Sequence, residues 1–186
     1  RRQPNYDWQQ YLPGNDSTLI WTENLSFSQL PQVINPSSGF VHSANQTPFN
    51  VTAAADNPNC ADFKPEHGFQ TNMTNRAQRG LELFSAWGPI SEAEFSAIKH
   101  DKYYSPQTPY VGYLDKVAAI KLSDPALKQA QQLLNDWDLG TDIQNTHAAM
   151  GTCVLLAAEK DSNSNAHEAH QITQLIQGCV DLLMAS

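Results

Sequence analysis

Charged residues are scarce in this 186-residue chain, and most of those present are acidic. Asp, Glu, Lys and Arg together make up 16% of the residues, and the formal net charge is −8 at pH 7. Such a chain offers no positive field to a phosphate backbone. The composition therefore argues against nucleic acid as a partner.

Long hydrophobic runs are missing as well. No apolar stretch approaches the roughly 20 residues that span a bilayer, and the mean hydropathy is −0.48. We therefore expect no membrane partner. Hydrophobic residues make up 40% of the chain, and Asn, Gln, Ser and Thr are abundant. This balance is typical of a globular chain rather than a disordered one, and the length suits one domain or part of one.

Cysteine is rare, and no Cys-x-x-Cys pair is present. A metal-thiolate or thioredoxin-like site is therefore unsupported, and we expect neither a metal nor a cofactor. His167 and His170 are three residues apart, not four as in a zincin helix, so we interpret them as solvated residues at a helix start. Either Cys153 and Cys179 form a disulfide between two successive predicted helices, or these two and Cys60 are buried thiols.

The chain changes character near residue 65. Residues 1–65 are dense in Pro, Asn, Ser and Gly, and the short apolar stretches Thr18–Trp21 and Phe40–His42 predict brief strands or extended segments. From residue 66 to 186, apolar residues recur at helical spacing. The sequence therefore predicts a mainly α fold, with an extended segment over 1–65 and a helical domain over 66–186 in one structural unit.

Helix start and stop signals are explicit in the second part. Ser91 with Glu94 is a capping box, and Asp124 followed by proline is an N-cap with proline at the first helical position. The predicted helices are about Asn72–Trp87, a short one after Ser91, one from Asp124 to Gly140, Thr146–Glu159 and Asn165–Leu183. We expect the last two to form an antiparallel α-hairpin.

The segment Leu30–Pro48 carries the most specific pattern in the chain. Its fixed positions are Asn35, Pro36, Gly39, the aromatic Phe40, Asn45 and Pro48. The pattern resembles, without a gap, a motif of the penicillin acylase family of N-terminal nucleophile hydrolases. Upstream, Tyr6–Pro13 is similar to the family's Trp-x-Gly-x-x-Pro segment, although Gln10 stands where glycine is usual.

Two downstream segments extend the resemblance. Arg76–Leu83 is similar to the family's arginine-bearing helix, and Leu134–Asp138 to its Leu-x-x-Trp-Asp block. The similarity covers about Tyr6 to Ala158. Within the family, the pattern most resembles the branch of acyl-homoserine-lactone and aculeacin-type lipopeptide acylases. It implies that the helical layer is a fragment of the β chain of an αββα hydrolase.

The resemblance implies amide hydrolysis through an acyl-enzyme. The nucleophile is a chain-terminal residue exposed by self-cleavage, and its own α-amino group is the general base. Asn45 occupies the position of the family's oxyanion-hole asparagine, whose neutral NH₂ donates to the developing negative charge. Arg79 matches the arginine beside the catalytic amine, with Arg76 as second choice. Phe40, in the same motif, is a candidate residue of the apolar acyl pocket.

The resemblance also implies partners. Residue 1 is Arg, so we expect this chain to lack the terminal nucleophile and to be inactive alone. Its partners would be the rest of the acylase, meaning the α chain and the sheet core of the β chain, and a small N-acyl substrate such as a β-lactam, acyl-homoserine lactone or lipopeptide. The expected location is periplasmic or secreted in a bacterium. The alternative is a non-catalytic helical binding module derived from the acylase fold.

Overall fold

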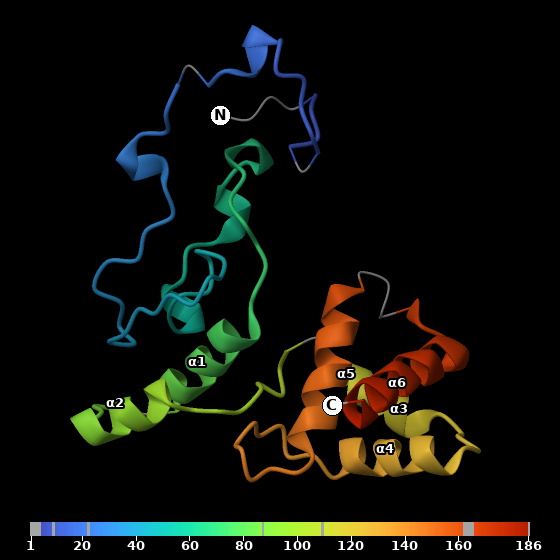
Figure 1. The fold of residues 1–186 in the computed structure, drawn as a ribbon. Helices are drawn as coiled ribbons and strands as arrows, with labels where there is room; N and C mark the ends of the chain where they lie inside the picture. The colour runs from blue at the N-terminus through green and yellow to red at the C-terminus, as the bar shows by residue number, and fades with distance from the viewer. Residues whose placement is uncertain are drawn as a thin grey trace. The chain divides into compact units, whose positions relative to one another are not determined.

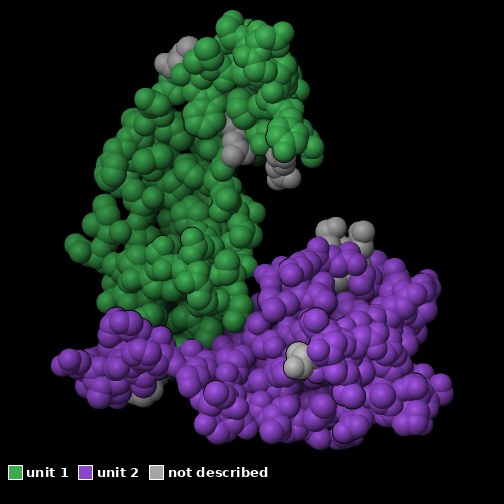
Figure 2. Space-filling view, viewed as in Figure 1, with its two compact units in different colours: residues 1–88 green, residues 89–186 purple. Residues whose placement is uncertain are grey.

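The structure, a computed structural model, describes residues 5–8, 10–21, 23–86, 88–108, 110–161 and 166–185. The chain divides into two compact units, Arg1–Gly88 and Pro89–Ser186, which Figure 2 shows in green and purple. The predicted mainly α fold is confirmed (Figure 1). The first helix belongs to the same unit as the extended segment, because residues of that segment bind its first turns. The unit boundary therefore lies at residue 88, whereas the sequence changes character near residue 65.

Unit 1 begins with a long extended segment interrupted by single 3₁₀ turns. These turns are η1 (Ser17–Leu19), η2 (Phe27–Gln29), η3 (Ala54–Asp56), η4 (Cys60–Asp62) and η5 (Pro65–His67). The sequence predicts brief strands or extended segments at Thr18–Trp21 and Phe40–His42, and neither stretch forms a strand. The Asp16 carboxylate accepts the Thr18 N–H at 2.9 Å, which favours a local turn, and Phe40–His42 is extended without a paired strand.

Helix α1 (Asn75–Ser85) closes unit 1. The Thr74 hydroxyl caps it by accepting the Ala77 N–H at 3.2 Å. The helix is shorter than the predicted 72–87, and Trp87 lies outside the described residues. Ala77 is fully buried, and Phe84 stacks on Phe40 with ring centroids 5.4 Å apart. The apolar face of α1 therefore packs against the motif segment.

Unit 2 contains the remaining helices. They are α2 (Glu92–Lys99), α3 (Gly112–Ala119), α4 (Pro125–Asn135), α5 (Ala148–Lys160) and α6 (Ala169–Met184). The caps predicted at Ser91 and Asp124 are confirmed. Helix α3 was not predicted, since it begins at a glycine and has no side-chain cap. Among the described residues, no helix has the length and apolar character of a membrane span.

Helices α3 to α6 form the hydrophobic core of unit 2, and Figure 1 shows them gathered together. The predicted hairpin is present, with α5 and α6 packed on each other and both on α4. The buried core residues are Tyr113, Val117, Leu127, Ala130, Leu134, Met150, Val154, Ala158, Ile172, Ile176 and Cys179. Burying such side chains contributes about 1.5–3 kcal/mol each for the larger ones.

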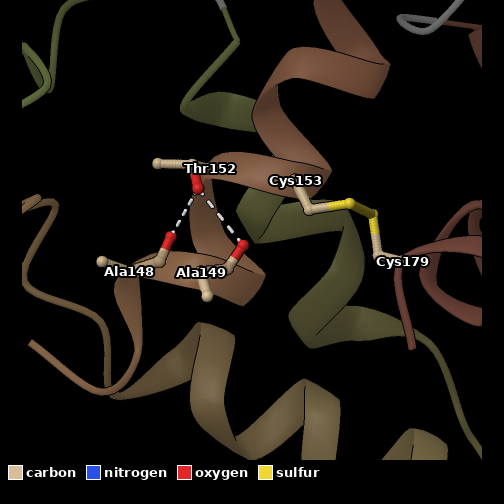
Figure 3. Close-up of a disulfide and its surroundings, with 5 residues drawn as sticks. All are labelled: Ala148, Ala149, Thr152, Cys153 and Cys179. Carbon is tan, nitrogen blue, oxygen red and sulfur yellow. Dashed lines mark hydrogen bonds between the residues drawn. A yellow bond between two sulfur atoms is a disulfide. The ribbon is translucent and has the colours of Figure 1, made fainter. Parts of the chain in front are cut away.

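A disulfide joins Cys153 of α5 to Cys179 of α6, with Cα atoms 5.9 Å apart. Figure 3 shows the bond crossing between the two helices, while the neighbouring Thr152 hydroxyl donates to the Ala148 carbonyl at 2.7 Å. Of the two alternatives left open by the sequence, the structure has the disulfide. Cys60 is an exposed free thiol, so the reading of three buried thiols is wrong.

Helix α4 ends earlier than Gly140, where the sequence placed its end. Leu139 has φ +67°, and the chain turns so that Trp137 Nε1 donates to the Gly140 carbonyl at 2.7 Å. The Trp137 ring packs directly on Gly151 of α5. Trp137 thus lies after the last residue of α4, and its indole ring fills the space beside α5. Gly140 pairs with Tyr103 in an isolated antiparallel bridge.

Candidate active-site segment

Asn45 lies on a tight loop at the end of the motif segment (Leu30–Pro48), and this loop lies beside α1. The loop is closed by a backbone bond from His42 N–H to the Val51 carbonyl at 2.9 Å, and by one from Thr47 N–H to the Asn72 carbonyl at 3.0 Å. Asn45 itself has φ +60°, a left-handed conformation that asparagine tolerates better than most residues. The side chain is exposed at the turn of the loop.

Arg76 holds the side chain of Asn45. Its Nη2 donates to Asn45 Oδ1 at 2.7 Å. A guanidinium has donors only, so the oxygen of the amide must face it, and the NH₂ group is directed away. Among the described residues, that NH₂ has no hydrogen-bond partner. The loop therefore presents a fixed, neutral donor to its surroundings.

Arg79 makes a different contact. Its Nη1 donates to Glu82 Oε2 at 3.3 Å, one turn farther along α1. The structure brings Asn45 together with Arg76 and not with Arg79 within the described contacts. Arg76 is nearer the start of α1, where the Thr74 hydroxyl donates to the Ala44 carbonyl at 2.9 Å and anchors the loop.

Phe40, a residue of the motif segment, is partly buried against α1. Its ring stacks on Phe84, and the His42 ring lies 6.4 Å away. Together with its neighbours it lines a shallow depression of about 360 Å³, whose lining residues are Asn35, Pro36, Gly39, Phe40 and Val41. Phe40 therefore packs on α1 and also lines a depression that is open to solvent.

Asp56 fixes the turn before Phe40. Its carboxylate accepts the Ser38 N–H at 2.9 Å and the Ser37 hydroxyl at 2.9 Å. These bonds, the backbone one first, hold the pKa of Asp56 below its ordinary value. Gly39 follows with φ +77°, where other residues would be strained. The carboxylate thus closes the Pro-Ser-Ser-Gly turn as an anion.

Unit 2 contains a second, larger depression of about 610 Å³. Its wall includes Asp138, His147 and the ion pair of Lys102 with Asp142, whose N and O atoms lie 2.6 Å apart. Donation from Lys102 and from the Gln144 N–H lowers the pKa of Asp142. Within the described residues, no group of three or more His, Cys, Asp or Glu side chains is arranged to hold a metal ion.

His167 has a structural role that its sequence position did not indicate. Its side chain is only 7% exposed and bridges Asp161 and Tyr113, with both contacts at 2.8 Å. The interpretation as a solvated residue is wrong for His167, because the ring is covered where α3 meets the start of α6. His170 is exposed, as expected.

Comparison with known proteins gives the family. The family model described as Penicillin amidase matches residues 1–178, nearly the whole chain and both structural units. The match includes the motif segment with the Asn45 loop, α1 and α5, and it ends one residue before Cys179, the disulfide partner of Cys153. The chain therefore belongs to the penicillin amidase family, a family of acylase-type hydrolases.

Proposed function

We propose that this chain contributes the oxyanion-hole donor of an acylase that hydrolyses the amide bond of a small N-acyl compound. The observation that carries the proposal is the bond from Arg76 to Asn45 Oδ1, which leaves the Asn45 NH₂ free to donate. A neutral donor fixed before the reaction stabilises the negative oxygen of a tetrahedral intermediate without reorganisation. Family membership supports the reaction class.

The geometry also favours Arg76 over Arg79 as the residue that orients the asparagine. A permanent cation on Oδ1 polarises the amide and makes its N–H groups better donors. Arg79 contacts Glu82 one turn away. We therefore assign the orienting role to Arg76 and keep Arg79, the closer match to the family motif, as the second choice.

The nucleophile in this proposal is a terminal Ser, Thr or Cys, with its own α-amino group as general base. In this proposal the terminal nucleophile belongs to the sheet core of the acylase β chain, and the α chain is a further partner. The acyl group would contact Phe40, which lines the depression beside the motif. β-Lactams, acyl-homoserine lactones and lipopeptides are the substrate classes to test.

We further propose a periplasmic or secreted location. Disulfides persist in oxidising compartments and are rare in the cytosol of most organisms. The bond between Cys153 and Cys179 supports this location.

The test is hydrolysis of N-acyl-4-nitroanilides by the full-length protein and by its Asn45→Gly variant. Glycine accepts the positive φ of this position, so the variant removes the donor without straining the loop. We expect kcat to fall about 10²- to 10³-fold, with an unchanged circular dichroism spectrum and unchanged self-processing by intact mass. Equal turnover would remove Asn45 from the mechanism. A full-length protein that hydrolyses none of these compounds would favour the non-catalytic binding module.

A further inference from the structure

His42 connects the Asn45 loop to α1 through its imidazole ring. Nδ1 lies 3.2 Å from the Val51 carbonyl oxygen, and Nε2 lies 3.1 Å from the Ala77 carbonyl oxygen on α1. Carbonyl oxygens only accept, so the neutral ring donates to one of them, through Nδ1 or Nε2 according to its tautomer. The side-chain nitrogen of Gln46 also lies 3.2 Å from Nε2. One side chain thus contacts two backbone segments that both follow it in the sequence, one at Val51 and one in α1 at Ala77.

Gln46 fixes the same part of the loop from inside. Its side-chain nitrogen donates to the carbonyls of His42 and Asn50, both at 3.2 Å, and its side-chain oxygen accepts the Ala44 N–H. The amide therefore bonds to backbone groups on both sides of the turn. The Gln46 bonds stabilise the conformation of the loop, and the His42 ring attaches the loop to α1.

Gly80 provides the space for this docking. A Cβ at this position would lie 3.0 Å from His42 Cδ2 and 3.3 Å from Nε2. The ring is therefore seated directly against the backbone of α1. The rings of Phe40 and Phe84, with centroids 6.4 and 6.2 Å from that of His42, pack beside it.

The His42 contact is one of several between the loop and α1. Nearer the helix start, the Thr74 hydroxyl donates to the Ala44 carbonyl and Arg76 donates to Asn45. The His42 ring binds farther along, at Ala77 and Gly80. Without it, the remaining contacts described here would be those at the start of α1 and the stacking of Phe40 on Phe84, and the direction of the Asn45 amide would be less well defined.

We propose that His42 is a positioning residue for the oxyanion donor. It does not touch the substrate; it holds the loop on α1 so that the Asn45 NH₂ points in one direction. This inference rests on the proposed function of Asn45. A displacement of about 1 Å at a reacting group can lower turnover by about 10²-fold.

Two substitutions in the full-length protein distinguish the contact of Nδ1 with Val51 from the contact of Nε2 with Ala77. In His42→Gln the amide nitrogen can reach the place of Nε2 and keep the bond to Ala77, whereas in His42→Asn it reaches only the place of Nδ1, beside Val51. We expect His42→Asn to lower kcat about 10- to 100-fold with KM changed less than about 3-fold. We expect His42→Gln to stay within about 5-fold of the wild type in both constants.

Hydrogen exchange supplies a readout that does not need activity. The Thr47 N–H, bonded to the Asn72 carbonyl, should exchange at least about 10-fold faster in His42→Asn than in His42→Gln. An Asn variant with unchanged kcat and unchanged exchange would overturn the inference, as would equal losses in both variants or a change confined to KM.

The two variants distinguish a failure of the positioning role of His42 from a failure of the proposed function of Asn45. If Asn45→Gly loses turnover while His42→Asn does not, the positioning inference fails and the proposed function stands. If Asn45→Gly keeps full turnover, the proposed function fails, and the inference fails with it whatever the exchange rates.

Discussion

At the scale of single residues, Asn45 combines two properties that few residue types share. Its backbone adopts φ +60°, which asparagine tolerates, and its side chain offers an acceptor to Arg76 and two N–H donors elsewhere. Aspartate would fit the backbone without donors, and glycine would have no side chain. The loop geometry and the proposed chemistry therefore select the same residue.

The two arginines of α1 give the first prediction. Arg76→Ala should lower kcat about 10- to 100-fold, because the Asn45 amide loses the contact that orients it. The loss of kcat in Arg79→Ala should be at least about 10-fold smaller than the loss in Arg76→Ala. The reason is that the pair of Arg79 with Glu82 is a partly exposed i,i+3 contact. Steady-state kinetics of both variants checks this. A larger loss from Arg79→Ala would return the orienting role to Arg79.

Asp56 gives a prediction about pH. Its pKa is lowered in the fold by the Ser38 N–H and the Ser37 hydroxyl, so its contribution to stability is present above the unfolded-state pKa. That contribution is lost as the pH falls through the lower, folded-state value. The amide resonance of Ser38 in an NMR titration should therefore change with a midpoint below the ordinary 3.8.

Asp56→Asn is the control for this titration. Because the variant has no carboxyl group at this position, the acid-dependent change at Ser38 should disappear. A wild-type midpoint at or above 3.8 would contradict the assignment of Asp56 as the anion that closes the turn.

The sequence could identify Asn45 but not its partner. The gapless motif around Asn45 has few alternative alignments, so the position is well defined. Arg76 and Arg79 are three residues apart on one helix, and residues at that spacing share a face. Only the tertiary contact with the loop distinguishes them. The contacts of His42 with Val51 and Ala77 were not predicted for the same reason.

At the scale of elements, helix starts were more predictable than helix ends. The caps of α2 and α4 are local, since the Ser91 and Asp124 side chains bond to N–H groups within three residues. The end of α4 depends on where the Trp137 indole packs, which involves α5. Helix α3 has no capping side chain, and only the spacing of Tyr113 and Val117 could have indicated it.

The contact between Trp137 and Gly151 gives the prediction at this scale. A Cβ on Gly151 would lie within van der Waals overlap of three atoms of the Trp137 ring. Gly151→Ala should therefore destabilise the protein by about 1–3 kcal/mol, through overpacking between α4 and α5. Urea unfolding followed by Trp fluorescence and by circular dichroism measures the change.

Gly178 in α6 is the matched control. A Cβ there would meet no atom within 4 Å, so Gly178→Ala should stabilise the protein by about 0.5–1 kcal/mol through the helix preference of alanine. If Gly151→Ala were as stable as Gly178→Ala, the close packing of Trp137 on α5 would be wrong.

At the scale of the whole molecule, the division into two units was the feature least accessible to sequence reasoning. The sequence marks a change from extended to helical spacing near residue 65, and the structure keeps α1 with the extended segment. The reason is that α1 packs its Phe84 on Phe40 and bonds to the Asn45 loop. Such contacts are between residues about 30 to 45 positions apart, which no local pattern reports.

The disulfide gives the prediction for unit 2 as a whole. Cys153 and Cys179 close a loop of 26 residues between α5 and α6. In the chain-entropy model this stabilises the fold by about 3–4 kcal/mol. Cys153→Ala should therefore lower Tm by several degrees, whereas Cys60→Ala, at an exposed free thiol, should leave it nearly unchanged. Equal Tm values for the two variants by calorimetry would show that the bridge adds nothing.

The most direct test of the central claim is the turnover of the Asn45→Asp variant of the full-length protein. Aspartate is close to asparagine in shape, fits the positive φ, and keeps an oxygen for Arg76, but it has no N–H to donate. The account predicts that kcat for N-acyl-4-nitroanilides falls about 10²- to 10³-fold, as in Asn45→Gly, while the fold is unchanged. A variant that retains wild-type kcat would contradict the account, because the Asn45 NH₂ would then not be the group that stabilises the intermediate.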